Sequence, residues 1–177
     1  RSEDLILGEL DQTEVEICDF AAFNMEPSGK MMKGLRTTTF QGILFKATFP
    51  KELAHWVYVC DKKEGCLRKE GEIALMDSPS FNRYFDVFTE DQILARYALS
   101  PKLMERFCGL KEKFNCPISM VLRNREVIIA ANLGKNSFEP SFEKSLLEDN
   151  TIRDYISSIK GFTDMVKELG LNNHIWK

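Results

Sequence analysis

The hydrophobic period of this chain changes along its length, and each change indicates a different kind of element. In the first half, β-branched and aromatic residues alternate with polar ones over short stretches, which is typical of half-buried strands. The central part repeats its apolar residues every three or four positions, as an amphipathic helix does. The alternation returns after Pro117. This order predicts strands, then helices, then a hairpin.

Four strands are predicted in the first half, at 15–23, 37–49, 55–60 and 73–76. The connection at 26–36 contains two glycines and a proline, which indicates a hairpin loop. Strands that follow one another through such connections favour an antiparallel meander.

Two helix starts can be identified from capping residues. Thr89 followed by Gln92 forms a capping box, which predicts a helix through Leu99. Ser100 precedes Pro101 as an N-cap and predicts a second helix. The apolar stripe of that second helix consists of Leu103, Phe107, Leu110 and Phe114.

The last third of the chain predicts a hairpin and a long helix. Alternating residues at 118–122 and 127–131 flank Asn124-Arg125, a pair that can form the turn. Asn150 then caps a long helix that Gly170 ends. The predicted fold class is therefore α+β. One domain over 1–177 contains an antiparallel β-sheet, made of a meander and a later hairpin, packed against about three helices that include the long C-terminal helix.

Length and charge limit the function classes. A chain of 177 residues is long enough for one domain with its own core. Its net charge of -3 gives no electrostatic reason to expect nucleic acid as a partner. No stretch is apolar enough to span a bilayer. Because the sequence starts at Arg1 without a methionine, we expect it to be the soluble part of a longer chain.

The five cysteines favour a reducing compartment, because their number is odd and they form no close-set metal-ligand pairs. A disulfide between Cys60 and Cys66 is geometrically conceivable across the turn at 61–65, but that compartment argues against it. Cys108 and Cys116 are interpreted as core residues rather than nucleophiles. With no phosphate loop, nucleophile elbow or histidine pair present, the sequence predicts no cofactor, no metal and no catalytic residue.

A series of motifs resembles an uncharacterised bacterial family, a domain of unknown function. The resemblance covers nearly the whole chain. It implies hydrophobic helices upstream of this domain, and hence a cytoplasmic location at the inner face of the bacterial membrane. The matching residues are Glu3-Asp4, Gly8, Thr39-Phe40-Gln41-Gly42, Phe81, Phe85-Asp86-Val87, Asp91-Gln92, Ala95-Arg96-Tyr97, Leu99-Ser100-Pro101, Met104-Glu105-Arg106, Asn136-Ser137-Phe138-Glu139-Pro140 and Leu171-Asn172.

Four charged residues in the central motif are candidates for a ligand site: Asp91, Arg96, Glu105 and Arg106. A carboxylate and a guanidinium in one cleft can bind a polar or anionic ligand. The alternative is structural, since charged residues beside helix starts commonly form caps and salt bridges.

Three basic residues of the 26–36 connection are candidates for contact with an anionic membrane surface: Lys30, Lys33 and Arg36. An ordinary solvated loop is the favoured explanation, because Glu26 is nearby and three charges fall short of a polybasic segment.

Three functions remain open from the sequence. The leading hypothesis is a non-enzymatic interaction or sensing module of a membrane-tethered protein, with a protein partner or small ligand. The second is an enzyme or small-ligand-binding domain with a pocket near Asp91, Arg96 and Glu105. The third is a peripheral lipid-binding domain. Fold-level analogy does not decide among them.

Overall fold

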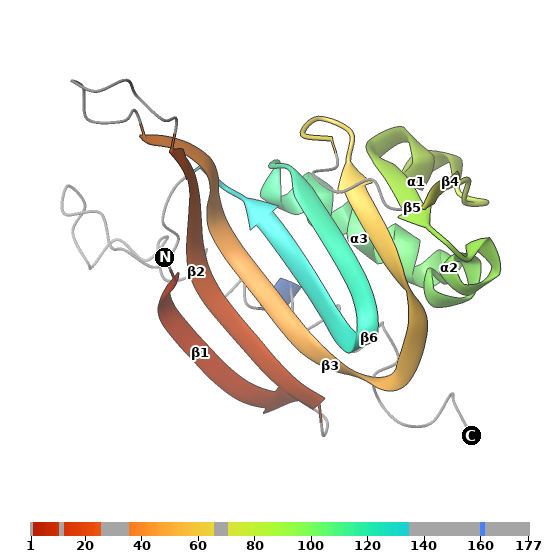
Figure 1. The fold of residues 1–177 in the computed structure, drawn as a ribbon, viewed down its shortest axis with the longest axis horizontal. Helices are drawn as coiled ribbons and strands as arrows, with labels where there is room; N and C mark the ends of the chain where they lie inside the picture. Colours follow the sequence, from red (N-terminus) through yellow and green to blue (C-terminus); the bar gives the residue numbers. More distant parts are fainter. Residues whose placement is uncertain (1, 11–12, 26–35, 66–70, 135–159, 162–177) are drawn as a thin grey trace.

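The computed structural model describes residues 2–10, 13–25, 36–65, 71–134 and 160–161. Within these residues, six strands form one antiparallel sheet, and three short helices lie on one side of it (Figure 1). The strands are β1 (Ser2–Leu10), β2 (Thr13–Met25), β3 (Arg36–Asp61), β4 (Glu72–Ala74), β5 (Phe85–Thr89) and β6 (Ile118–Asn132). The helices are α1 (Pro79–Tyr84), α2 (Gln92–Ala98) and α3 (Pro101–Phe114).

Two long strands fold back on themselves, and one lies inside the other (Figure 1). The first arm of β3 pairs through residues 42–48 with residues 126–132 of β6, and its second arm pairs through 57–59 with 120–122. The two ends of β6 meet, because the Asn132 N–H donates to the Pro117 carbonyl at 2.9 Å. Asn124 adopts φ 49° at the tip, a conformation that asparagine tolerates. The hairpin predicted around Asn124 is therefore confirmed.

The predicted α+β class is wrong, because the sheet dominates the described residues, in which six strands are accompanied by three short helices. The sequence predicts neither β1 nor β5, and it divides β3 into separate strands. It also predicts a simple meander, whereas β6 lies between the two arms of β3. The long helix predicted from Asn150 lies outside the described residues, apart from a helical Lys160 and Gly161. No long C-terminal helix is seen in the part that is described.

The helix starts agree in part with the capping signals. Ser100 caps α3, since its hydroxyl accepts the Leu103 N–H. The cap of α2 is Asp91 rather than Thr89, which is the last residue of β5. The Thr89 hydroxyl instead bonds the backbone of Asp91. Two residues with capping side chains, two positions apart, make the exact start ambiguous from local sequence alone.

The main core lies between the helices and one face of the sheet. Three phenylalanine rings meet in it: Phe85 lies 4.7 Å from Phe107 and 5.0 Å from Phe81, measured between ring centroids. The stripe predicted for α3 is buried at Leu103, Phe107 and Leu110. Aromatic rings such as these supply a large buried area for each residue.

A buried ion pair joins β3, α3 and β6. Asp61 is 1% exposed and Lys111 is 6% exposed. The Lys111 ammonium donates to the Asp61 carboxylate and, at 2.8 Å, to the Cys116 carbonyl. The same carboxylate accepts the N–H groups of Lys63 at 2.9 Å and Ile118 at 3.1 Å. This cluster of donors compensates a charge that would be costly to bury alone.

Replacing Lys111 with Met is expected to lower the free energy of unfolding by about 3–5 kcal/mol, because it leaves the Asp61 carboxylate buried without its cation. Urea denaturation measures the change. Lys63→Met is the control, since that side chain is exposed. Adding Asp61→Asn to Lys111→Met should recover part of the loss, and a double variant no more stable than the single one would contradict this explanation.

Gly42 is required by close packing between β3 and β6. A Cβ atom there would lie 2.0 Å from the Ala131 carbonyl oxygen, whereas a Cβ at Gly109 on α3 would meet nothing within 4 Å. We expect Gly42→Ala to destabilise the fold by about 1–3 kcal/mol through overpacking. Gly109→Ala should be neutral or stabilise α3 by about 0.5–1 kcal/mol. Equal unfolding midpoints for the two variants would show that the close approach is absent.

Candidate functional site

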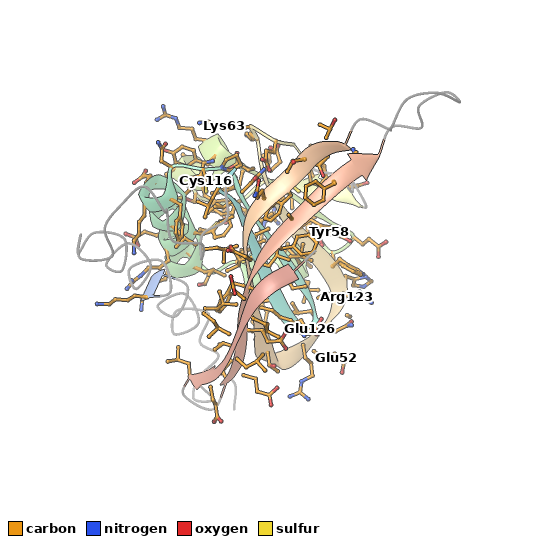
Figure 2. The ribbon with its side chains drawn as sticks, turned by 90° about the vertical axis from the view of Figure 1, so that its left-hand side faces the viewer. Glu52, Tyr58, Lys63, Cys116, Arg123 and Glu126 are labelled. Carbon is orange, nitrogen blue, oxygen red and sulfur yellow. The ribbon has the colours of Figure 1, made fainter. Side chains whose placement is uncertain are left out.

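A second apolar cluster lies on the face of the sheet opposite the helices, and we call it the outer cluster. Figure 2 shows Tyr58 on that side and Cys116 on the helix side. No helical residue belongs to it among the residues that the structure describes. Its members are Trp56, Tyr58, Cys60, Phe88 and Val121.

Strand geometry explains why these residues meet. Successive side chains of a strand point to opposite faces, so Val57 and Val59 enter the main core while Trp56, Tyr58 and Cys60 face the other side. Tyr58 pairs with Phe88 on β5 and with Val121 on β6. Ile73 of β4 pairs with Phe88 and is 54% exposed. The outer cluster thus continues into an exposed apolar residue at the edge of the sheet.

An aromatic stack carries a guanidinium at one end of the outer cluster. The Trp56 and Tyr58 rings stack with centroids 5.3 Å apart and planes 10° apart. The Arg123 Cζ lies 4.0 Å from the centroid of the Trp56 ring. Since Val57 pairs with Leu122, Trp56 and Arg123 are cross-strand neighbours. This cation–π contact places a positive charge beside the apolar surface.

The charged residues around the outer cluster form local pairs. Lys46 lies 3.2 Å from Glu126 and 3.4 Å from Glu16. The hydrogen bond with Glu126 is the main cause that raises the pKa of Lys46. His55 lies 3.0 Å from Glu90. These pairs are exposed or half-exposed, so each contributes little to stability.

The ligand-site candidates from the sequence are placed on the helices. The Asp91 carboxylate caps α2, accepting the Ile93 N–H at 2.9 Å and the Leu94 N–H at 3.0 Å. That agrees with the structural alternative for this residue. Arg96 is exposed on α2, and Glu105 and Arg106 are exposed on α3. A ligand-binding role for these four residues stays a prediction.

The basic candidates of the 26–36 connection are not placed by the structure. Lys30 and Lys33 lie outside the described residues, and Arg36 is described only as the first residue of β3. Membrane contact through them stays a prediction. Among the described helices, none is long and apolar enough to cross a membrane.

The described cysteines are poor nucleophiles. Burial is the main cause that raises the pKa of the Cys18 and Cys108 thiols, and it raises the pKa of Cys116 to about 11. Cys60 is disulfide-bonded, with a partner outside the described residues. Because disulfides persist mainly in oxidising compartments, this bond counts against the reducing compartment favoured by the cysteine count. No group of three or more metal-ligating side chains occurs in the described part of the chain.

The outer cluster was missed because its sequence signal is ambiguous. The residues from Val57 to Cys60 are all apolar, so the sequence indicates a continuous apolar strand rather than an alternating one, and all four are buried in the structure. Such a run indicates burial on both faces without saying what covers the second face. Arg123 was not predicted as a functional residue, because a single arginine beside a predicted turn forms no binding motif.

Comparison with known structures supports the fold. The crystal structure of the mycobacterial trehalose monomycolate transport factor A, TtfA, is similar to this chain with a TM-score of 0.51 at 11% sequence identity. The match covers 94% of this chain and 72% of that one. At this identity the likeness concerns the fold alone.

Comparison by sequence identifies the family. No curated protein matched the chain. A family model described as "Protein of unknown function (DUF3137)" matches residues 38–171. This range contains β3 from its third residue onward, the helices α1, α2 and α3, and β6, and it includes the central motif on which the family resemblance rested. The chain therefore belongs to the DUF3137 family, a family of domains of unknown function.

Proposed function

We propose that this domain is a non-catalytic binding module that holds the apolar chain of a lipid-like amphiphile on the outer face of its sheet. The observation that carries the proposal is the outer cluster. It gathers large aromatic and aliphatic side chains on the side of the sheet that no described helix covers. Tyr58, Cys60 and Phe88 are buried at the centre of the cluster, whereas Trp56 and Val121 at its margin are half-buried and the adjoining Ile73 is 54% exposed. Exposed apolar surface at such a margin is typical of a binding surface.

Two features of the candidate residues argue against an enzyme, and a structural comparison supports a lipid-like ligand. The candidate Asp91 carboxylate is occupied in capping α2, and the raised thiol pKa values disfavour a cysteine nucleophile. In addition, the structurally similar TtfA is described as a transport factor for trehalose monomycolate. The proposal specifies the ligand for the interaction module expected from the sequence. The membrane tether and the cytoplasmic location stay predictions from the family resemblance.

Quenching of Trp56 fluorescence tests the proposal directly. Trp176 is the other tryptophan of the chain, so a Trp176→Phe background leaves Trp56 as the sole emitter. The probe is a monoacylglycerol with a brominated stearoyl chain, because bromine quenches an indole ring that it contacts. We expect saturable quenching below the concentration at which the probe aggregates.

Ile73→Glu and Val121→Glu should each weaken the binding by roughly tenfold or more, because a chain lying there would bury an unpaired charge. Ile93→Glu is the matched control, since Ile93 is also exposed, at 79%, but lies on α2 away from the outer cluster. Circular dichroism melts check that the variants fold. Absence of saturable quenching, or equal weakening by all three variants, would reject the proposed function.

A further inference from the structure

Two arginines at the tip of the β6 hairpin have no anionic partner in the described part of the chain. Arg123 and Arg125 flank Asn124 and are exposed. Arg123 makes a cation–π contact with the Trp56 ring, and neither Arg123 nor Arg125 has a hydrogen bond or ion pair among the described residues. Arg123 therefore lies beside the outer cluster and Arg125 lies two residues away at the hairpin tip, and neither is bound to a carboxylate in the described part of the chain.

The contact with Trp56 positions Arg123 without using its hydrogen-bonding capacity. A guanidinium that lies over an aromatic ring presents its planar face to the ring and keeps its N–H groups. Tyr58 stacks on the same indole, which restricts the ring and hence the arginine. A fixed guanidinium with free donors is suited to bind a carboxylate or phosphate through paired hydrogen bonds.

Neighbouring carboxylates do not compete strongly for these arginines. Glu126 is bound by Lys46 at 3.2 Å, and Glu90 is bound by His55 at 3.0 Å. Glu52 is exposed on the turn of β3, and no ion pair joins it to either arginine in the described residues. Figure 2 shows Arg123, Glu126 and Glu52 along one edge of the outer face. This arrangement supports recognition of an anion by individual side chains rather than by a broad positive electrostatic field, because the chain as a whole carries a net charge of -3.

We infer that Arg123 and Arg125 bind the anionic head of the amphiphile whose chain lies on the outer cluster. This inference rests on the proposed function and adds the class of ligand: a single-chain amphiphile with a carboxylate or phosphate head. The cross-strand pairing of Trp56 with Arg123 places the start of the apolar surface next to the guanidinium. Head and chain are therefore recognised by adjacent side chains on β3 and β6.

The test compares a charged and a neutral probe with the same chain. In the Trp176→Phe background, brominated stearate should bind roughly tenfold or more tightly than the brominated monoacylglycerol, because charge-assisted hydrogen bonds form only with the carboxylate. The variant Arg123→Gln/Arg125→Gln should abolish this preference, so that the two probes bind with equal affinity. Arg83→Gln is the matched control, because Arg83 is also exposed and lies 6.0 Å from the Tyr84 ring on α1.

The outcomes separate this inference from the proposed function. Equal affinity for the two probes, or a preference that survives in the double variant, would overturn the role of the arginines and leave the apolar surface in place. A preference lost equally in Arg83→Gln would indicate a general charge effect and would also overturn it. If neither probe quenches Trp56 saturably, the proposed function itself fails.

Discussion

The buried Asp61 carboxylate sets the relative positions of three elements. Asp61 is the last residue of β3. Its carboxylate accepts one hydrogen bond from the Lys111 ammonium, in the last turn of α3, and another from the Ile118 N–H at the start of β6. A charge in this position is tolerated only with these partners, since an unpaired buried carboxylate costs several kcal/mol, or roughly a third of a typical domain's stability. The start of β6 is thereby fixed next to the end of β3, and the rest of the hairpin enters between the two arms.

The position of β6 decides what the second face of the sheet presents. Because residues 120–122 pair with 57–59, Val121 lies beside Tyr58 and Arg123 lies beside Trp56. A shift by one residue would turn these side chains to the other face. The described helices α1, α2 and α3 cover the face that contains the main core. The same strands therefore stabilise the fold on one side and form the proposed binding surface on the other.

Local signals predicted several elements well. Ser100 and Pro101 identified the start of α3, and Asn124 identified the turn of the β6 hairpin, because caps and tight turns depend on neighbouring residues. Other elements failed for physical reasons. The strand β1 was not predicted, because its large apolar residues Leu5 and Leu7 are exposed, whereas a half-buried strand usually buries such residues. The charged residues of the central motif were predicted as a ligand site, whereas Asp91 serves as a helix cap. The outer cluster was not predicted, because its aromatic residues lie far apart in the chain.

The sequence by itself determined the family, the antiparallel strands of the first half, the capped α3 helix and the hairpin, since each depends on residues close together in the chain. Only the tertiary structure decided that β6 enters between the arms of β3, that Asp61 and Lys111 form a buried pair, and that Arg123 lies over Trp56. These contacts join residues 50 or more positions apart. Their formation depends on strand register and on the compensation of a buried charge, which no local pattern of side chains records.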